Sequence, residues 1–433
     1  MQIVMRGLGV NIEGHLTLGG ASVPELAKQY GTPLYLLDEQ VIRANCREII
    51  GGLRDHYKAP FTVAFASKAL CFTELYKLLR DEGMGADVVS GGELYTAIKG
   101  DFDPADVFFH GNNKSVTELE YALDTGVRRI VVDNAEELEL LSVIAERRGI
   151  VPEISFRIKP GIDAHTHEFI KTGKIDSKFG LALETGEAEA VIARAAKLKT
   201  VRVVGIHCHI GSQIFGTEPF NLAAKIMLTF MRNLREKLGV PLNELNLGGG
   251  FGIQYLPNHT PVTLGDMSRI CAESVTAAAD ELNLPLPSLV LEPGRTITGP
   301  AGLTVYTVGS VKKIPEVNTY VAVDGGMTDN PRYALYNAYY EPIVPERPNA
   351  PVTQKVIIAG RCCESGDMIT RDAPICEVKV GDLLAIQATG AYNYSMASNY
   401  NRLPRPPIVM VNNGVPRVVV RRETYDDILA CDQ

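Results

Sequence analysis

Lys68 is the first residue whose type and setting predict chemistry. It ends the apolar run FTVAFASK, and Ala69 and Leu70 follow it. We expect a lysine in this setting to lose hydration, which makes its amine easier to deprotonate and able to attack an aldehyde. A strand-end lysine that simply extends to solvent is the alternative, and Lys68 alone does not separate the two.

A glycine cluster and an acidic motif follow two later apolar runs. In LNLGGGFG, Gly248, Gly249 and Gly250 leave a predicted strand, and their backbone N–H groups could converge on a phosphate. A tight turn is the alternative. In EPGR, the Glu292 carboxylate could keep a pyridine nitrogen protonated, and Arg295 suits a phosphate or carboxylate. A Glu–Arg pair that closes one end of a domain would be the structural explanation.

Two further motifs combine possible proton donors, carboxylates or metal ligands. His207 and His209 form an H-x-H pair, which on a strand would put both rings on one face. No third-ligand motif follows, so we predict no metal site, and a ring stacked on an aromatic cofactor or an ordinary packed histidine remains. In GRCCESGD, Cys363 precedes Glu364, which could combine a proton donor with a binder of a substrate ammonium, unless the pair is a buried thiol beside a surface acid.

The elements that must position these residues are short apolar runs that alternate with segments of helical periodicity. About eight such runs predict a (β/α)8 TIM-type barrel, with a doubly wound open sheet as the alternative. The runs lie at 61–68, 86–90, 107–112, 129–134, 153–161, 203–212, 244–252 and 289–295. The expected helices between them include 72–82, 135–148 and 219–238.

In both architectures the active site gathers at the carboxyl ends of the strands. The polar residues expected at those ends are Lys68, Asp87, His110, Asp133, Arg157, His209, the Gly248 loop and Glu292. A barrel without a function at this edge would have little reason for so much polarity there.

The pattern changes after about Gly299 to short strands separated by turns, which predicts a β-rich domain. NNG at 412–414 is a good hairpin turn. GHLTLGG and TPLYLLD, near the start of the chain, look like further strands. We therefore predict an N-terminal segment at 1–38 that packs with the β-rich domain, a cofactor-binding barrel over 39–299, and the β-rich domain over 300–433.

Composition narrows the class of protein. The net charge of -8, without a long basic run, argues against nucleic-acid binding. No apolar stretch reaches the roughly 18 residues of a membrane span, and the N-terminus lacks the apolar core of a signal peptide, so we expect no membrane partner and a cytoplasmic location. The 8 cysteines are scattered without a C-x-x-C pair, as expected of free thiols.

The motifs FASKA, HIGSQ, GGGFG, EPGR, CCESGD and GAYNYSMASNYNR, in this order, resemble the motif series of the fold-type III pyridoxal-phosphate decarboxylases, the alanine-racemase-like barrel enzymes. HGNNKS, DSKFG, VDGGMTDNPR and NRLPRPP extend the resemblance over nearly the whole chain. Within this family the motifs are most similar to those of the members that act on diaminopimelate.

The resemblance implies pyridoxal 5'-phosphate as the cofactor and assigns residue roles. Lys68 would be the Schiff-base lysine, His209 would stack on the cofactor ring, and Glu292 would be the partner of the pyridine nitrogen. Cys363 would donate a proton to the decarboxylated carbon, and Cys363 and Glu364 would enter the site of the other subunit in a homodimer. The expected cofactor-binding residues are Lys68, His209, Ser212, Gly248, Gly249, Gly250, Glu292, Pro293, Gly294, Arg295 and Tyr392.

The implied reaction converts meso-2,6-diaminopimelate to L-lysine and CO2, the last step of lysine biosynthesis. A substrate with a distal carboxylate and a distal ammonium needs partners for both. The expected substrate-binding residues are Arg295, Arg332, Tyr336, Glu364 and Tyr392. In DNPRYALY, Tyr333 stands where the family usually has proline, and we expect this to change a local turn more than binding.

Four alternatives remain at this stage. A decarboxylase of ornithine, arginine or lysine would use the same scaffold. An amino-acid racemase of this fold should avoid the strong electron sink that Glu292 would create. A catalytically inactive, regulatory homologue should have lost Lys68 or Cys363, and both are present. A metal hydrolase on a barrel would use the H-x-H pair.

Overall fold

The computed structural model describes residues 5–162 and 177–433, and the chain divides into two compact units. The barrel unit comprises Asn45–Gly252 and Pro261–Gly294. The β-rich unit comprises Met1–Ala44, Ile253–Thr260 and Arg295–Gln433. The division therefore falls after Ala44 and before Arg295, whereas the sequence suggested 38 and 300, and the 253–260 segment was not expected in the β-rich unit. Asp176 of the DSKFG motif lies outside the described residues.

The barrel unit contains the closed parallel barrel of eight strands that the sequence predicts. Its strand order is β9-β11-β12-β13-β5-β6-β7-β8, and pairing of β8 with β9 closes the ring, which excludes an open sheet. The strands are β5 (Phe61–Ala66), β6 (Gly85–Val88), β7 (Val107–Phe109), β8 (Arg129–Val132), β9 (Glu153–Lys159), β11 (Arg202–His207), β12 (Glu244–Asn246) and β13 (Ser288–Leu291). A short strand, β10 (Leu181–Ala182), adds to β9 outside the ring.

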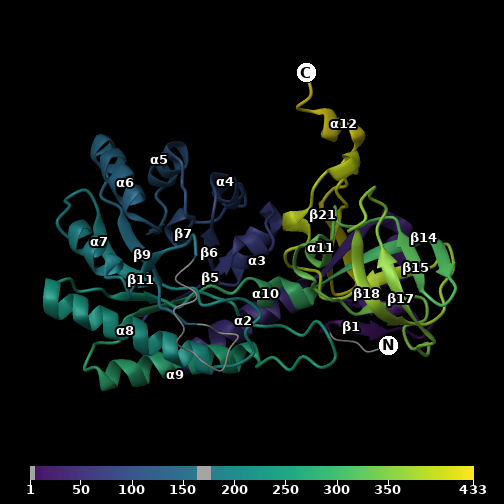
Figure 1. Ribbon diagram of the computed structural model, residues 1–433, viewed down its shortest axis with the longest axis horizontal. Coiled ribbons are helices and arrows are strands. Elements are labelled where there is room, and N and C mark those ends of the chain that lie inside the picture. The colour runs from purple at the N-terminus through teal and green to yellow at the C-terminus, as the bar shows by residue number, and fades with distance from the viewer. Residues whose placement is uncertain (1–4, 163–176) are drawn as a thin grey trace. The chain divides into compact units, whose positions relative to one another are not determined.

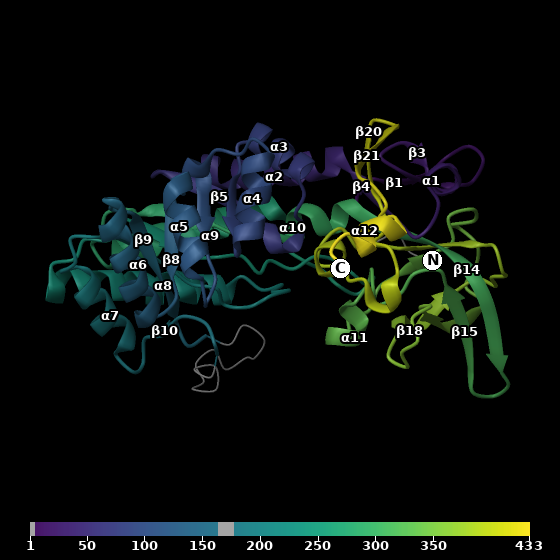
Figure 2. The ribbon, with the colours of Figure 1, turned by 90° about the horizontal axis from the view of Figure 1, so that it is seen from above.

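Helices alternate with the strands along the chain and cover the barrel (Figure 1, Figure 2). They are α2 (Glu39–His56), α3 (Thr73–Asp81), α4 (Gly91–Lys99), α5 (Val116–Thr125), α6 (Ala135–Arg148), α7 (Glu187–Ala195), α8 (Glu218–Leu238) and α9 (Leu264–Glu281). Polar caps fix where several begin: the side chains of Ser90, Ser115 and Asn134 each accept a hydrogen bond from the backbone N–H three residues later. Each of these three caps follows a barrel strand and fixes the residue at which the next helix begins.

The β-rich unit contains one large sheet, which the N-terminal segment joins through one strand, and a separate three-stranded sheet that the N-terminal segment forms alone. Strand β4 pairs antiparallel with β14 on one side and parallel with β20 on the other. The strands are β1 (Leu8–Val10), β2 (Leu16–Leu18), β3 (Ala21–Ser22), β4 (Leu34–Asp38), β14 (Gly302–Ile314), β15 (Asn318–Val323), β16 (Pro342–Ile343), β17 (Gln354–Ala359), β18 (Met368–Ile375), β19 (Leu383–Ile386), β20 (Ile408–Asn412) and β21 (Val415–Val420). The helices of this unit are α1 (Val23–Tyr30), α10 (Arg295–Thr298), α11 (Arg332–Tyr336) and α12 (Tyr425–Leu429). The prediction that the N-terminal segment joins the β-rich part is confirmed.

Two features of the β-rich unit can be compared directly with what the sequence predicted. The predicted hairpin turn joins β20 to β21, with Asn413 and Gly414 at positive φ. Strand β18, which pairs with β17, was missed because Arg371, Asp372 and Pro374 interrupt its apolar pattern. Two of these three residues sit on exposed positions of the strand, where polar side chains are tolerated.

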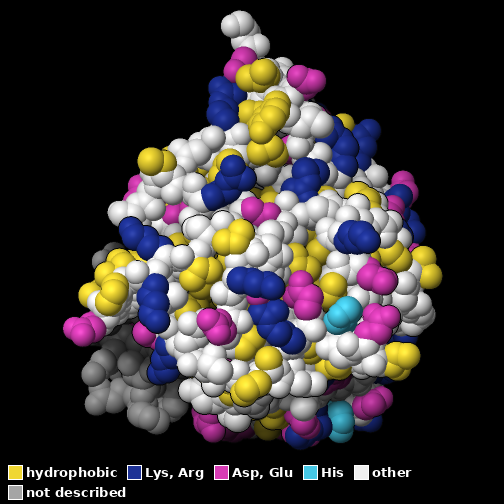
Figure 3. All heavy atoms as spheres, turned by 90° about the vertical axis from the view of Figure 1, so that its right-hand side faces the viewer, with side chains coloured by type: hydrophobic (Ala, Val, Ile, Leu, Met, Phe, Trp, Pro, Cys, Tyr) yellow, Lys and Arg dark blue, Asp and Glu magenta, His cyan; other side chains and the backbone are white. Residues whose placement is uncertain are grey.

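The surface carries both signs of charge. On the face shown in Figure 3, basic and acidic side chains are interspersed, without one large field of a single sign. Within 5–162 and 177–433, no helix has the length and apolar character needed to cross a membrane.

Candidate functional site

Lys68 lies at the carboxyl end of β5, in a 3-10 turn at Ser67–Ala69. Ser67 and Ala69 are fully buried, and the Ser67 hydroxyl accepts a hydrogen bond from the Tyr76 hydroxyl at 2.7 Å. The Lys68 side chain is exposed. The expectation that its apolar neighbours remove its hydration is therefore wrong: the turn buries the two flanking residues and directs the lysine outward.

Lys68 faces a cavity of about 690 Å³ at the carboxyl end of the barrel. Its lining includes His110, which follows β7, Arg157 from β9 and His209, which follows β11. Burial and the positive charges of Lys68 and Arg157 hold the pKa of His209 well below its usual range. The cavity thus presents a primary amine and a neutral imidazole from two different strands of the barrel.

The H-x-H pair is split between two environments. Strand β11 ends at His207, so the alternation that would put both rings on one strand face stops before His209. His207 is buried, and its Nε2 atom lies 3.2 Å from Oε2 of Glu292. His209 lines the cavity instead. The two histidines therefore meet different partners at the same end of the barrel.

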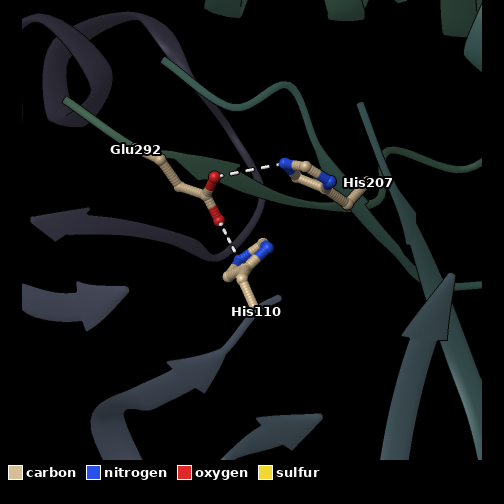
Figure 4. A group of neighbouring side chains, drawn as sticks. All are labelled: His110, His207 and Glu292. Carbon is tan, nitrogen blue, oxygen red and sulfur yellow. Dashed lines mark hydrogen bonds and ion pairs between the residues drawn. The ribbon is translucent and has the colours of Figure 1, made fainter. Parts of the chain in front are cut away.

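Glu292 follows β13 and is buried among polar side chains (Figure 4). Its Oε1 atom lies 2.8 Å from Nε2 of His110 and accepts a hydrogen bond from Nδ2 of Asn246 at 2.6 Å. Asp87 of β6 lies 3.8 Å from the same His110 nitrogen, and burial next to these charged groups raises the pKa of Asp87 to about 6. The sequence placed Asp87 and His110 at strand ends without roles and did not single out Asn246.

The glycine loop packs closely on its neighbours. A Cβ atom on Gly249 would lie 1.9 Å from the backbone oxygen of Glu292, and Gly248 and Gly250 have φ of 68° and 101°. The Gly248 N–H donates a hydrogen bond to Oδ1 of Asn246 at 2.8 Å, so this amide is engaged inside the protein. A phosphate role for the loop therefore rests on the Gly249 and Gly250 amides. Ser212, after β11, is exposed.

The remaining residues of the EPGR motif connect Glu292 to the lysine turn. The Ala66 N–H donates a hydrogen bond to the Pro293 oxygen at 3.0 Å. A Cβ atom on Gly294 would lie 3.0 Å from the Cβ atoms of both Ala66 and Ala69, so only glycine fits without displacement. Lys68 and Glu292 are therefore held by two segments in direct contact.

A second polar cluster lies within the β-rich unit. The Tyr255 hydroxyl accepts hydrogen bonds from Nη1 of Arg295 at 2.5 Å and from Nη1 of Arg332 at 2.9 Å. Arg332 also donates to the Tyr340 hydroxyl at 2.9 Å, and the Arg295 guanidinium lies 4.7 Å from the ring centre of Tyr392. The structure thus brings together Arg295, Arg332 and Tyr392, three of the predicted residues. Tyr255 and Tyr340 belong to the same cluster, and no sequence motif indicated them.

The other predicted residues of the β-rich unit are exposed. Tyr336 ends α11 and is 63% exposed, apart from the tyrosine–arginine cluster. Cys363 and Glu364 lie on an exposed loop, where the Cys363 N–H donates a hydrogen bond to Oδ1 of Asn401 at 2.8 Å. Asp367 fixes the base of this loop, because its carboxylate accepts the N–H groups of Cys362 and Met327, each at 2.6 Å.

Glu292, His110 and His207 also lie close enough to hold a metal ion, with ligand atoms within 4.8 Å of one another. Both carboxylate oxygens are already engaged by imidazole nitrogens, and Asn246 adds an N–H donor to Oε1. A cation would have to compete with these donors. The contacts of Glu292 with His110 and His207 are enough to explain why the three side chains lie close together.

The barrel residues fit pyridoxal phosphate on their own chemistry. An exposed amine opens onto a cavity whose volume is in the usual range for small-molecule sites. A neutral imidazole lines that cavity, and an ionised carboxylate lies against His110 at the same end of the barrel. An aromatic aldehyde with a ring nitrogen requires these three groups. The amine binds its carbonyl carbon, the neutral imidazole packs against its ring, and the carboxylate is the partner of its nitrogen.

Comparison with known proteins agrees with this fold and site. Residues 43–299 match the family described as pyridoxal-dependent decarboxylase, pyridoxal binding domain. The chain belongs to the pyridoxal-dependent decarboxylases, and its cofactor is pyridoxal phosphate.

The relatives narrow the family further. Diaminopimelate decarboxylase of Bacillus methanolicus is 45% identical over 96% of both chains, and that of Bacillus subtilis is 45% identical over 98% of this chain and 96% of its own. The solved diaminopimelate decarboxylase of M. jannaschii, in complex with L-lysine, has a TM-score of 0.93 at 35% identity and covers 100% of this chain and 99% of that one. Within the family, this chain falls among the diaminopimelate decarboxylases.

Proposed function

We propose that this chain is a carboxy-lyase that converts meso-2,6-diaminopimelate to L-lysine and CO2, with pyridoxal phosphate bound through Lys68. The observation that supports this most is the position of Lys68, which opens onto a cavity lined by His209 at the carboxyl end of the barrel. The identity to diaminopimelate decarboxylases over nearly the full chain supports the substrate.

Each barrel residue then has a defined task. Lys68 would hold the cofactor through its amine. His209, kept neutral by burial and nearby cations, packs against the cofactor ring without adding a charge there. Glu292 keeps the ring nitrogen protonated. When bound, the cofactor withdraws the electron pair left behind by CO2. Ser212 and the Gly248–Gly250 loop bind its phosphate, with Arg295 and Tyr392.

The tyrosine–arginine cluster recognises the distal end of the substrate. Arg332 and Arg295 present guanidinium groups that suit a carboxylate, and their close approach to each other concentrates positive charge. Tyr336, which is exposed outside the cluster, would add a hydroxyl, and Glu364 of the other subunit would pair with the distal ammonium. A substrate such as ornithine lacks the distal carboxylate and would leave two buried cations without an anion.

The active enzyme is a homodimer in which each subunit completes the site of the other. Cys363 and Glu364 are exposed on a loop whose base is fixed by Asp367, as needed for groups that act on a second copy. In that setting the Cys363 thiol donates the proton to the carbon that lost CO2.

A cytoplasmic location is part of the proposal. Support comes from the cysteines, all eight of which are free thiols in the structure, including the exposed Cys363 and Cys431. Free exposed thiols persist in a reducing compartment.

The test is turnover of the purified chain with pyridoxal phosphate and meso-diaminopimelate, followed by CO2 and by chiral analysis of the amino-acid product. We expect CO2 and L-lysine in equal amounts, with ornithine, arginine and lysine turned over at a small fraction of that rate. Preferred turnover of one of these amino acids would overturn the substrate, and an epimerised product without CO2 would identify a racemase.

A further inference from the structure

Three buried side chains from three different parts of the barrel meet at the Glu292 carboxylate. Asn246 ends β12, His207 ends β11 and His110 follows β7. All four side chains are at most 6% exposed. The two imidazole rings lie edge to face, with their centres 4.7 Å apart, and each directs Nε2 to a different carboxylate oxygen (Figure 4). The carboxylate is thus held from both sides.

The histidines decide whether Glu292 is charged. Burial alone would raise the pKa of this carboxyl and favour its neutral form. The interactions of Glu292 with His110 and His207 outweigh burial and hold the pKa of Glu292 well below its usual range. Glu292 therefore stays ionised because of its neighbours.

The two histidines contribute differently. Burial opposes the charge of His110, but Glu292 and Asp87 outweigh it and raise the pKa of His110. For His207, burial dominates and lowers the pKa to about 4. Nδ1 of His207 has no hydrogen-bond partner among the described residues, so its proton belongs on Nε2, next to Glu292. Of the two histidines, His110 is therefore the one that more readily carries a positive charge, and His207 is a neutral donor at neutral pH.

Asn246 links this cluster to the glycine loop. Its Oδ1 accepts the Gly248 N–H at 2.8 Å, which fixes the orientation of the amide and leaves its NH2 group facing Glu292. One side chain thus ties the backbone of the loop expected to bind phosphate to the residue expected to face the ring nitrogen.

We propose that His110, His207 and Asn246 are positioning residues that keep Glu292 ionised and in one orientation, with His110 supplying the neutralising charge. This inference rests on the proposed function in one respect, the assignment of Glu292 to the ring nitrogen. Its consequence is that the protonation state of the cofactor ring depends on His110, a residue that the mechanism above does not use.

The proposal is tested first on the wild-type protein without cofactor. Side-chain NMR titration of ring-labelled histidines should show His110 protonated above its usual pKa of 6.5 and His207 neutral from pH 5 to 8. In Glu292→Gln the pKa of His110 should fall by at least one unit, a tenfold loss of proton affinity. Unchanged titration of His110 in this variant would overturn the proposal, whatever the enzyme's substrate is.

The second test uses the holoenzyme with cofactor labelled at the ring nitrogen, and it compares His110→Gln, His207→Gln and His56→Gln. His56 is exposed at the end of α2 and serves as the matched control. The nitrogen chemical shift should report a protonated ring between pH 6 and 9 in the wild type, His56→Gln and His207→Gln. It should titrate within that range in His110→Gln.

These outcomes distinguish the role of His110 from the role of Glu292. A ring nitrogen that stays protonated in His110→Gln but not in Glu292→Gln would overturn the role of His110 and leave Glu292 as the ring partner. A ring nitrogen indifferent to Glu292→Gln would overturn the assignment of Glu292 itself, and with it the link to the proposed function.

Discussion

Arg332 donates a hydrogen bond to the hydroxyl of Tyr255 over 2.9 Å, and both side chains are buried. Arg295 donates to the same oxygen, so one phenol holds two guanidinium groups in place. Two guanidinium groups that one phenol holds close together suit an anionic group such as a carboxylate. In the proposed enzyme this is the site of the distal substrate carboxylate.

Tyr255→Phe should therefore weaken substrate binding more than the chemical step. We expect the KM for meso-diaminopimelate to rise about tenfold, because both arginines lose a charge-assisted hydrogen bond, while kcat changes by less than about threefold. Steady-state kinetics measures the split. Tyr95→Phe, on an exposed tyrosine of α4, is the control. A loss confined to kcat would contradict the proposed role of the cluster.

The opposite end of the barrel is closed by a buried ion pair. Arg129, at the start of β8, binds both carboxylate oxygens of Glu244, at the start of β12, at 2.8 and 2.7 Å, and it also contacts Glu153 at the start of β9. Arg129→Ala should lower the free energy of unfolding by about 3–5 kcal/mol, since Glu244 is left as a buried charge. Urea unfolding measures this loss.

The double variant Arg129→Met, Glu244→Leu is the matched control for that measurement. Removing both charges leaves no uncompensated ion, so it should be much less destabilised than Arg129→Ala. Equal losses in the two variants would show that packing, and not the buried charge, explains the effect.

Asp329 gives the β-rich unit a pH-dependent stability. Burial raises the pKa of Asp329 to about 7 from its usual 3.8, although its carboxylate accepts hydrogen bonds from Tyr306 and the Gly326 N–H. The folded state therefore holds the proton more tightly than the unfolded chain, and stability falls as the pH rises from about 4 to 7. Between pH 5 and 7, this group alone costs about 1.4 kcal/mol per pH unit.

Asp329→Asn should remove that contribution. The difference in free energy of unfolding, variant minus wild type, should move in favour of the variant as the pH rises from 5 to 7 and then remain constant. Urea titrations at several pH values give the difference. A difference that is independent of pH would show that Asp329 does not titrate in this range.

Sharing of sites between subunits has a quantitative signature. Lys68→Ala and Cys363→Ala should each be inactive alone. Mixed before assembly, they should form dimers with one intact site, and random pairing would restore about a quarter of the wild-type activity. The test is the activity of the mixture, measured before the two variants are unfolded and refolded together and measured again afterwards. No recovery, with mixed dimers shown by mass spectrometry, would place Cys363 in the site of its own subunit.

The sequence was a good guide to the barrel because each β/α unit repeats the same local pattern. Strands buried on both faces read as continuous apolar runs, and each of the eight predicted runs overlaps a barrel strand, with α6 found at its predicted bounds. Strand β18 was missed because Arg371 and Asp372, two exposed residues in its middle, break the apolar pattern.

The sequence predicted only some of the site residues, because the others are identified only by contacts in the folded chain. Residues next to a motif, such as Glu292 or Gly249, could be found from the sequence. The strand pattern placed His110 at the correct edge of the barrel, but the contacts of His110 with Glu292 and of Tyr255 with Arg332 join residues distant in the chain, and no local pattern shows them. Asn246 had a local signal, since a polar residue at the end of an apolar strand, two residues before a glycine loop, needs an internal partner.

The central claim is that Lys68 holds the cofactor, and reduction of the holoenzyme with borohydride followed by peptide mass spectrometry tests it most directly. The account predicts that the phosphopyridoxyl group is found on the peptide containing Lys68 at close to one per chain, and that Lys68→Ala loses it. A label on another lysine, or full labelling of Lys68→Ala, would contradict the account.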